Sequence, residues 1–129
     1  MNFRSSPGGI VVSPSDEIFV ADMRHKQIQV YNMLGVQLLK FPTVVPGKSN
    51  VTMKPFDVSM DSEGHLWVVG VSDQVKHRYW VVRYTQGGCA EFGVSTIQGL
   101  LFRGIVVDKE RNRIITTGEY NGRVIIVVL

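Results

Sequence analysis

Internal repetition is the feature that most constrains how this chain folds. Three similar segments follow one another, covering residues 8–32, 56–84 and 104–128. Ser13, Asp61 and Asp108 take equivalent places in them, 48 and then 47 positions apart. A repeat of this length is typical of a solenoid, a propeller or another array of small structural units. Each unit buries its apolar surface against its neighbours.

Each copy alternates short apolar runs with polar turns. The runs are rich in Val, Ile, Phe, Trp and Tyr, which favours strands, and no segment has a sustained apolar stripe of helical period. We expect strands at residues 10–12, 18–21 and 28–31, at 58–60, 66–69 and 80–84, and at 105–107, 114–117 and 124–127. The first two copies add a fourth run, VQLLKF and CAEFGV, and the third stops at Leu129 without one.

Four antiparallel strands in 40 to 50 residues are typical of one blade of a β-propeller. The sequence therefore predicts an all-β fold, with residues 1–129 forming a single propeller segment. Its three blades cover about residues 7–41, 55–94 and 102–129, and the third lacks its outer strand.

The first copy resembles the NHL repeat, the blade of a family of mostly six-bladed propellers. The resemblance rests on Pro7, on GIVV from Gly9 to Val12, on IFVAD from Ile18 to Asp22 and on QIQVY from Gln27 to Tyr31. The later copies keep less of it, in LWVVG, GIVVD and GRVIIV, and Ser13 replaces the usual aspartate. The resemblance implies a setting such as the C-terminal domain of tripartite-motif proteins, which bind RNA or recruit proteins through these propellers.

A propeller closes with roughly four to eight blades, so three blades form only part of a ring. Two explanations stay open. The chain is a partial six-bladed ring, with the other blades elsewhere in a longer protein, or two copies associate as a homodimer that completes a ring of six.

Charge is divided unequally between the two ends of the predicted blades. The loops that join second to third strands, and one blade to the next, carry more basic than acidic residues, whereas the turns between first and second strands are acidic. Cations interleaved with aromatic rings suit phosphates and stacked bases, so we expect a binding face there. Its candidate residues are Arg24, His25, Lys26, Lys76, His77, Arg78, Tyr79, Arg103, Tyr120, Asn121 and Arg123. The alternative is that these residues are solvated or make contacts between blades.

Catalytic signals are weak in the sequence. The three histidines and the single cysteine, Cys89, have no metal-ligand spacing, and the first strands offer only Asp57 as a carboxylate, beside Gly9 and Gly104. We therefore predict that the chain is not an enzyme and holds no metal or cofactor. The alternative is a fragment of a six-bladed lactonase or lyase whose metal ligands lie in missing blades.

The resulting hypothesis is a non-catalytic binding module for a protein or for single-stranded or hairpin RNA. It would be the substrate-recognition part of a tripartite-motif E3 ubiquitin ligase, with ligase activity in a separate domain. A single cysteine suits a reducing compartment, and no apolar run is long enough to span a bilayer, so we expect a cytoplasmic protein without a membrane partner.

Overall fold

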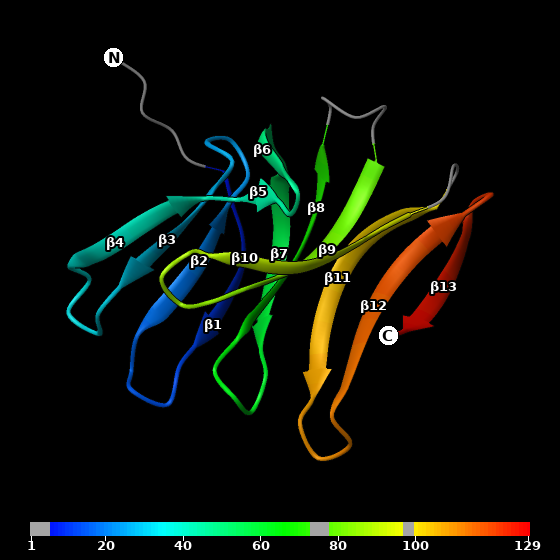
Figure 1. Ribbon diagram of the computed structural model, residues 1–129. Coiled ribbons are helices and arrows are strands. Elements are labelled where there is room, and N and C mark those ends of the chain that lie inside the picture. The colour runs from blue at the N-terminus through cyan, green and yellow to red at the C-terminus, as the bar shows by residue number, and fades with distance from the viewer. Residues whose placement is uncertain (1–5, 73–77, 97–99) are drawn as a thin grey trace.

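The computed structural model describes residues 6–72, 78–96 and 100–129 and contains no helix among them, which confirms the all-β prediction (Figure 1). Accordingly, no described segment is a helix that would cross a membrane. The strands form four antiparallel sheets. The first sheet contains β1 (Pro7–Val12), β2 (Ile18–Asp22), β3 (Gln27–Tyr31) and β4 (Gln37–Pro42). The second contains β7 (Lys54–Met60), β8 (Leu66–Ser72), β9 (Arg78–Tyr84) and β10 (Ala90–Ser95). The third contains β11 (Leu101–Asp108), β12 (Arg113–Tyr120) and β13 (Arg123–Val128).

A small fourth sheet links the first sheet to the second. It is a hairpin of β5 (Val44–Val45) and β6 (Lys48–Thr52), and Gly47 in its turn has a φ of +77°. Pro followed by Gly favours such a turn, because proline fixes one φ and glycine accepts a positive one. The sequence analysis does not predict this element, although Pro46 and Gly47 signal its turn.

The polar turns between first and second strands are built alike in all three repeats. Ser13 Oγ accepts the amide of Glu17 at 3.1 Å, Asp61 Oδ1 accepts two amides of its turn at 2.9 Å, and Asp108 Oδ1 accepts the Arg111 amide at 3.4 Å. Short polar side chains that bond nearby amides stabilise turns. The serine at position 13 therefore replaces the usual aspartate without loss of this role.

The second sheet lies between the other two, and both of its faces are covered. One apolar core lies between the first and second sheets and includes Phe19, Ile28 and Tyr84, and another lies between the second and third sheets and includes Trp67 and Ile105. Every residue of β8 is buried as a result, which explains its nearly continuous apolar run, LWVVGVS. The first strands β1, β7 and β11 lie side by side, with β7 in contact with the other two (Figure 1).

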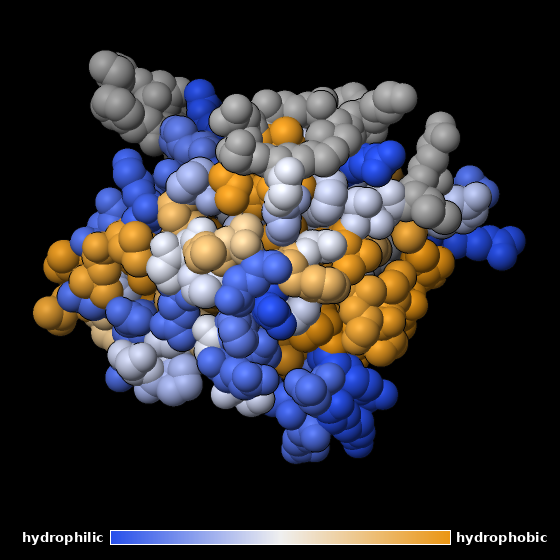
Figure 2. Space-filling model, viewed as in Figure 1, coloured by the Kyte–Doolittle hydropathy of each residue, from blue (hydrophilic) through white to orange (hydrophobic). Residues whose placement is uncertain are grey.

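The outward faces of the first and third sheets remain open. Ile10 and Val12 are exposed on β1, and Val124, Ile126 and Val128 are exposed on β13. Hydrophobic surface is visible over the third sheet in Figure 2, whereas the turns below it are hydrophilic. These two faces are where a further sheet would pack.

Candidate functional site

The three first strands are irregular at the same place. The register of β1 with β2 shifts between Pro7 and Ile10, that of β7 with β8 between Pro55 and Asp57, and that of β11 with β12 between Phe102 and Ile105. Bulges of this kind re-aim side chains and are frequent beside active sites. We call the residues that they bring together the inner-strand bulge site; they are Gly8, Gly9, Phe56, Asp57, Arg103 and Gly104.

Glycine at positions 8 and 9 allows the first and second sheets to approach closely. A Cβ on Gly9 would lie 1.7 Å from Asp57 Oδ1, and a Cβ on Gly8 would lie 2.2 Å from the carbonyl oxygen of Phe56. Any larger residue there would collide with the second sheet. The two glycines thus let β1 lie directly against the Asp57 carboxylate.

Asp57 joins the second sheet to the third. Its Oδ1 accepts the amide of Val58 at 2.9 Å, and its Oδ2 accepts the amide of Ile105, on β11, at 3.0 Å. Two residues further along β7, Ser59 Oγ accepts the amide of Val107, on β11, at 3.1 Å. Asp57 is half-buried, and a carboxylate has about four lone-pair sites, so two backbone bonds fix its position and leave acceptor capacity.

Arg103 precedes Gly104, the third-sheet residue that adjoins this carboxylate. Its guanidinium carbon is 5.4 Å from the centre of the Phe56 ring and 5.7 Å from the centre of the Tyr79 ring, and the two ring centres are 6.0 Å apart. The Arg103 side chain is exposed, and Tyr79 is half-buried. Cation–π contacts of this geometry hold a guanidinium over an aromatic surface.

A second polar cluster surrounds Asp22, which is 1% exposed. Its carboxylate contacts His25 Nδ1 at 2.9 Å, Gln27 Nε2 at 3.1 Å, Gln29 Nε2 at 2.7 Å and the Ser6 amide at 3.3 Å. Burial alone would raise the pKa of Asp22, but these hydrogen bonds outweigh burial and hold the pKa well below its usual range. The cluster fixes the turn between β2 and β3.

A third polar cluster lies at the opposite end of the second sheet. His65 contacts Asp61 and Glu91 at 3.3 Å each, and Arg83 Nε lies 3.4 Å from Glu91. Trp67 Nε1 donates to Asp61 Oδ2 at 3.0 Å. Burial of Asp61 opposes ionisation, but hydrogen bonds from Trp67 and two backbone amides outweigh it and lower its pKa. These contacts join the turn after β7 to the strands β9 and β10.

The structure distributes the predicted binding residues over three places. Arg24, His25 and Lys26 lie at the turn between β2 and β3, where His25 pairs with Asp22 and Lys26 has a φ of +52°. Tyr120, Asn121 and Arg123 form the tip of the β12–β13 hairpin. Tyr79 and Arg103 are in contact between the second and third sheets, whereas Arg78, the residue before Tyr79 on β9, is exposed. Lys76 and His77 lie outside the described residues.

Sequence reasoning identified Asp57 between Gly9 and Gly104, but it did not identify Phe56 as part of a site. Phe56 precedes Asp57 as Arg103 precedes Gly104, and both positions are equivalent to Gly8. The repeat spacing is thus a signal that could have aligned these residues.

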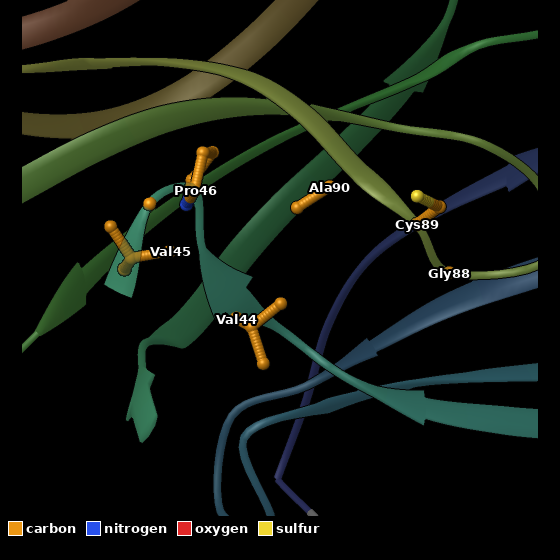
Figure 3. Close-up of a pocket in the computed structure, with 7 residues that line it drawn as sticks. Val44, Val45, Pro46, Gly88, Cys89 and Ala90 are labelled. Carbon is orange, nitrogen blue, oxygen red and sulfur yellow. The ribbon is translucent and has the colours of Figure 1, made fainter. Parts of the chain in front are cut away.

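One open depression lies away from the bulge site. It has a volume of about 440 Å³, lies between the β5–β6 hairpin and the start of β10, and is lined by Val44, Val45, Pro46, Gly47, Gly88, Cys89 and Ala90 (Figure 3). Its lining is largely apolar, and the exposed thiol of Cys89 is its one nucleophilic side chain. Among the described residues, no group of three or more His, Cys, Asp or Glu side chains is placed to hold a metal ion.

Comparison with known proteins identifies an NHL repeat at residues 5–31. No curated protein matches the chain. Among solved structures, a luciferin-regenerating enzyme superposes with a TM-score of 0.62 at 17% identity, over 86% of this chain and 36% of that one. Glutaminyl cyclase from Myxococcus xanthus superposes with a TM-score of 0.64 at 13% identity, over 100% of this chain and 59% of that one. A protein of unknown function from Bacteroides caccae superposes with a TM-score of 0.53 at 12% identity, over 100% of this chain and 47% of that one.

These comparisons correct one prediction. The chain was expected not to be an enzyme, yet two of the structures that share its fold are enzymes by name. The expectation was wrong because it treated scarce catalytic groups in three sheets as evidence against catalysis. This chain spans 36% and 59% of the lengths of those enzymes, so the residues of three sheets do not decide the matter. The chain contains an NHL repeat and has a propeller-type fold.

Proposed function

We propose that this chain is part of a propeller enzyme that acts on a small molecule at the inner-strand bulge site. The observation that carries the proposal is the position of Asp57, whose carboxylate lies where all three first strands bulge and is fixed by amides from two sheets. The likeness of this chain in fold to a luciferin-regenerating enzyme and to a glutaminyl cyclase supports a catalytic role for the inner-strand bulge site.

The proposed role of Asp57 is proton transfer during nucleophilic attack on a carbonyl carbon. Its carboxylate accepts the proton from the attacking water or amine while the new bond to carbon forms, and passes it to the oxygen or nitrogen that leaves. Lactone hydrolysis and cyclisation of an N-terminal glutaminyl residue both need this transfer. A positioned acid or base contributes typically 10²- to 10⁴-fold to such a rate.

Among the described residues no metal site is formed, and the proposed proton transfer uses the Asp57 carboxylate. Neighbouring blades, from a longer chain or from a second copy, would complete the walls of the site. The tripartite-motif setting and the recruitment of RNA or protein through the basic loops stay predictions.

The test is turnover by the purified protein of small lactones and of a peptide with an N-terminal glutamine. We expect one of these classes to be converted, and we expect Asp57→Asn to lower kcat at least about 100-fold. Glu110→Gln, which removes an exposed carboxylate from the β11–β12 turn, is the matched control and should leave kcat unchanged. Absence of turnover for both classes, or equal rates for wild type and Asp57→Asn, would refute the proposal.

A further inference from the structure

We propose that Arg103 binds the anionic group, a carboxylate or a phosphate, of the small molecule that enters the inner-strand bulge site. The inference rests on the proposed function for the location of the ligand and adds the chemical class that the ligand belongs to. It is carried by the way in which Arg103 is held and by the absence of an acidic partner for it among the described residues.

The guanidinium of Arg103 is fixed in orientation without using its hydrogen-bond donors. Phe56 and Tyr79 offer their ring faces at 5.4 and 5.7 Å from its central carbon. The β7 bulge sets the position of the Phe56 ring. Tyr79 is anchored through its backbone amide, which donates to Thr96 Oγ1 at 3.2 Å. Stacking leaves the five N–H donors at the guanidinium edge available.

Three other arginines are paired with carboxylates, whereas Arg24, Arg78 and Arg123 have, among the described residues, neither an acidic partner nor a ring to stack on. Arg83 stacks on Trp67 at 5.9 Å but also pairs with Glu91, and Arg111 and Arg113 both pair with Asp108. Within the described residues, Arg103 forms no ion pair and donates no hydrogen bond, although its side chain is exposed. A planar guanidinium with free donors recognises carboxylate and phosphate through two parallel hydrogen bonds.

The position of Arg103 relates it to the proposed chemistry. Arg103 and Gly104 together form the bulge of β11, and a Cβ on Gly104 would lie 3.6 Å from Asp57 Oδ2. Both oxygens of Asp57 already accept backbone amides, from Val58 and Ile105. Arg103 is thus one residue from the glycine that adjoins Asp57, and we place the anionic group of the ligand at Arg103 and its reacting carbonyl at Asp57.

The experiment is a calorimetric titration of the purified protein with inorganic phosphate and, separately, with succinate. The variants are Arg103→Gln, Arg103→Lys and, as a matched control with the same loss of charge in the exposed β11–β12 turn, Arg111→Gln. We expect saturable binding of at least one anion and a Kd raised at least tenfold by Arg103→Gln. The increase should be smaller for Arg103→Lys, which keeps the charge but loses the two parallel donors of the guanidinium. Arg111→Gln should leave the Kd within about twofold. Thermal melting verifies that each variant folds.

Preference for phosphate or for succinate identifies which anion the site takes, and either result supports the inference. No saturable binding of either anion, or an equal increase in Kd for Arg103→Gln and Arg111→Gln, overturns it. The titration does not depend on catalysis. Anion binding through Arg103 without turnover would support the anion site and refute the proposed enzymatic function. Turnover that is insensitive to Arg103→Gln, without anion binding, would support the enzymatic function and refute the anion site.

Discussion

Asp22 shows how one buried carboxylate organises a whole turn. Its side chain is 1% exposed and receives hydrogen bonds from three side chains and one amide. Such a carboxylate stabilises the fold while it is ionised, because its pKa is lower in the folded state than in the unfolded state. The stabilisation is complete above the unfolded pKa of about 3.9, and it is lost as the pH falls from there through the folded pKa.

We predict that Asp22→Asn lowers the free energy of unfolding at pH 7 by about 1–3 kcal/mol, because buried donors lose a charged acceptor. The difference from wild type should shrink as the pH is lowered below about 4, since wild type loses the same contribution there. Urea denaturation at pH 7 and pH 3 measures both effects. Asp16→Asn, at an exposed position of the first turn, serves as the control. An unchanged difference between wild type and Asp22→Asn at the two pH values would contradict the assignment.

At the scale of elements, a buried hydroxyl joins the β5–β6 hairpin to the second sheet, beside the apolar packing of Val45. Tyr84, on β9, donates to the carbonyl oxygen of Val44 at 2.7 Å, and its ring packs 5.9 Å from that of Phe41. Burial raises the pKa of the Tyr84 hydroxyl, which stays a donor throughout the accessible pH range.

We predict that Tyr84→Phe lowers the free energy of unfolding by about 1 kcal/mol, since the ring is kept and one hydrogen bond is lost. Backbone amide exchange of the hairpin should accelerate more than that of β8, because only the hairpin loses an attachment. Tyr120→Phe removes a hydroxyl from an exposed ring and should change neither quantity. Equal exchange of the hairpin in wild type and Tyr84→Phe would show that the hydroxyl does not hold the hairpin.

The strands and turns were accessible from the sequence because alternation of apolar residues and short polar turns are local signals. The bulges were not, because Gly8–Gly9 and Arg103–Gly104 interrupt the alternation and so shortened the predicted first strands. Gly9, Asp57 and Gly104 were nevertheless aligned correctly by the repeat. The contact of Arg103 with Phe56 and Tyr79 joins strands of two sheets, and nothing local in the sequence specifies such a pairing. His25 is only three residues from Asp22, but the sequence does not show that the Asp22 carboxylate is buried and turned toward that ring.

At the scale of the whole molecule, the open faces of the first and third sheets correspond, by the repeat, to the two faces of the second sheet, which are both covered. Ile10 and Val12 on β1 correspond by the repeat spacing to Val58 and Met60, which are buried against the first sheet. On the third sheet, Ile126 corresponds to Val81, which is buried in the core against that same third sheet. The free face of the third sheet is therefore of the kind that accepts the free face of the first.

We predict that the 129-residue chain associates head to tail with a second copy, the third sheet of each copy covering the first sheet of the other. Two such contacts close a symmetric ring, which places two Asp57 side chains around one axis. Ile126 is 71% exposed, and burial of side chains of this type contributes about 1.5–3 kcal/mol each. Light scattering after size exclusion should give a mass near twice 14.4 kDa.

Charge on the proposed interface tests this arrangement directly. Ile126→Lys places an ammonium group where an apolar sheet would pack, and we expect it to weaken association at least tenfold because a buried charge without a partner is costly. Val36→Lys adds the same charge to an exposed turn between β3 and β4, at the edge of the first sheet opposite β1, and should leave the mass unchanged. A mass of 14.4 kDa for wild type at every concentration would exclude the two-copy ring. The open faces would then be left for further blades of a longer chain, and the bulge site would be completed by residues of that chain instead of a second Asp57.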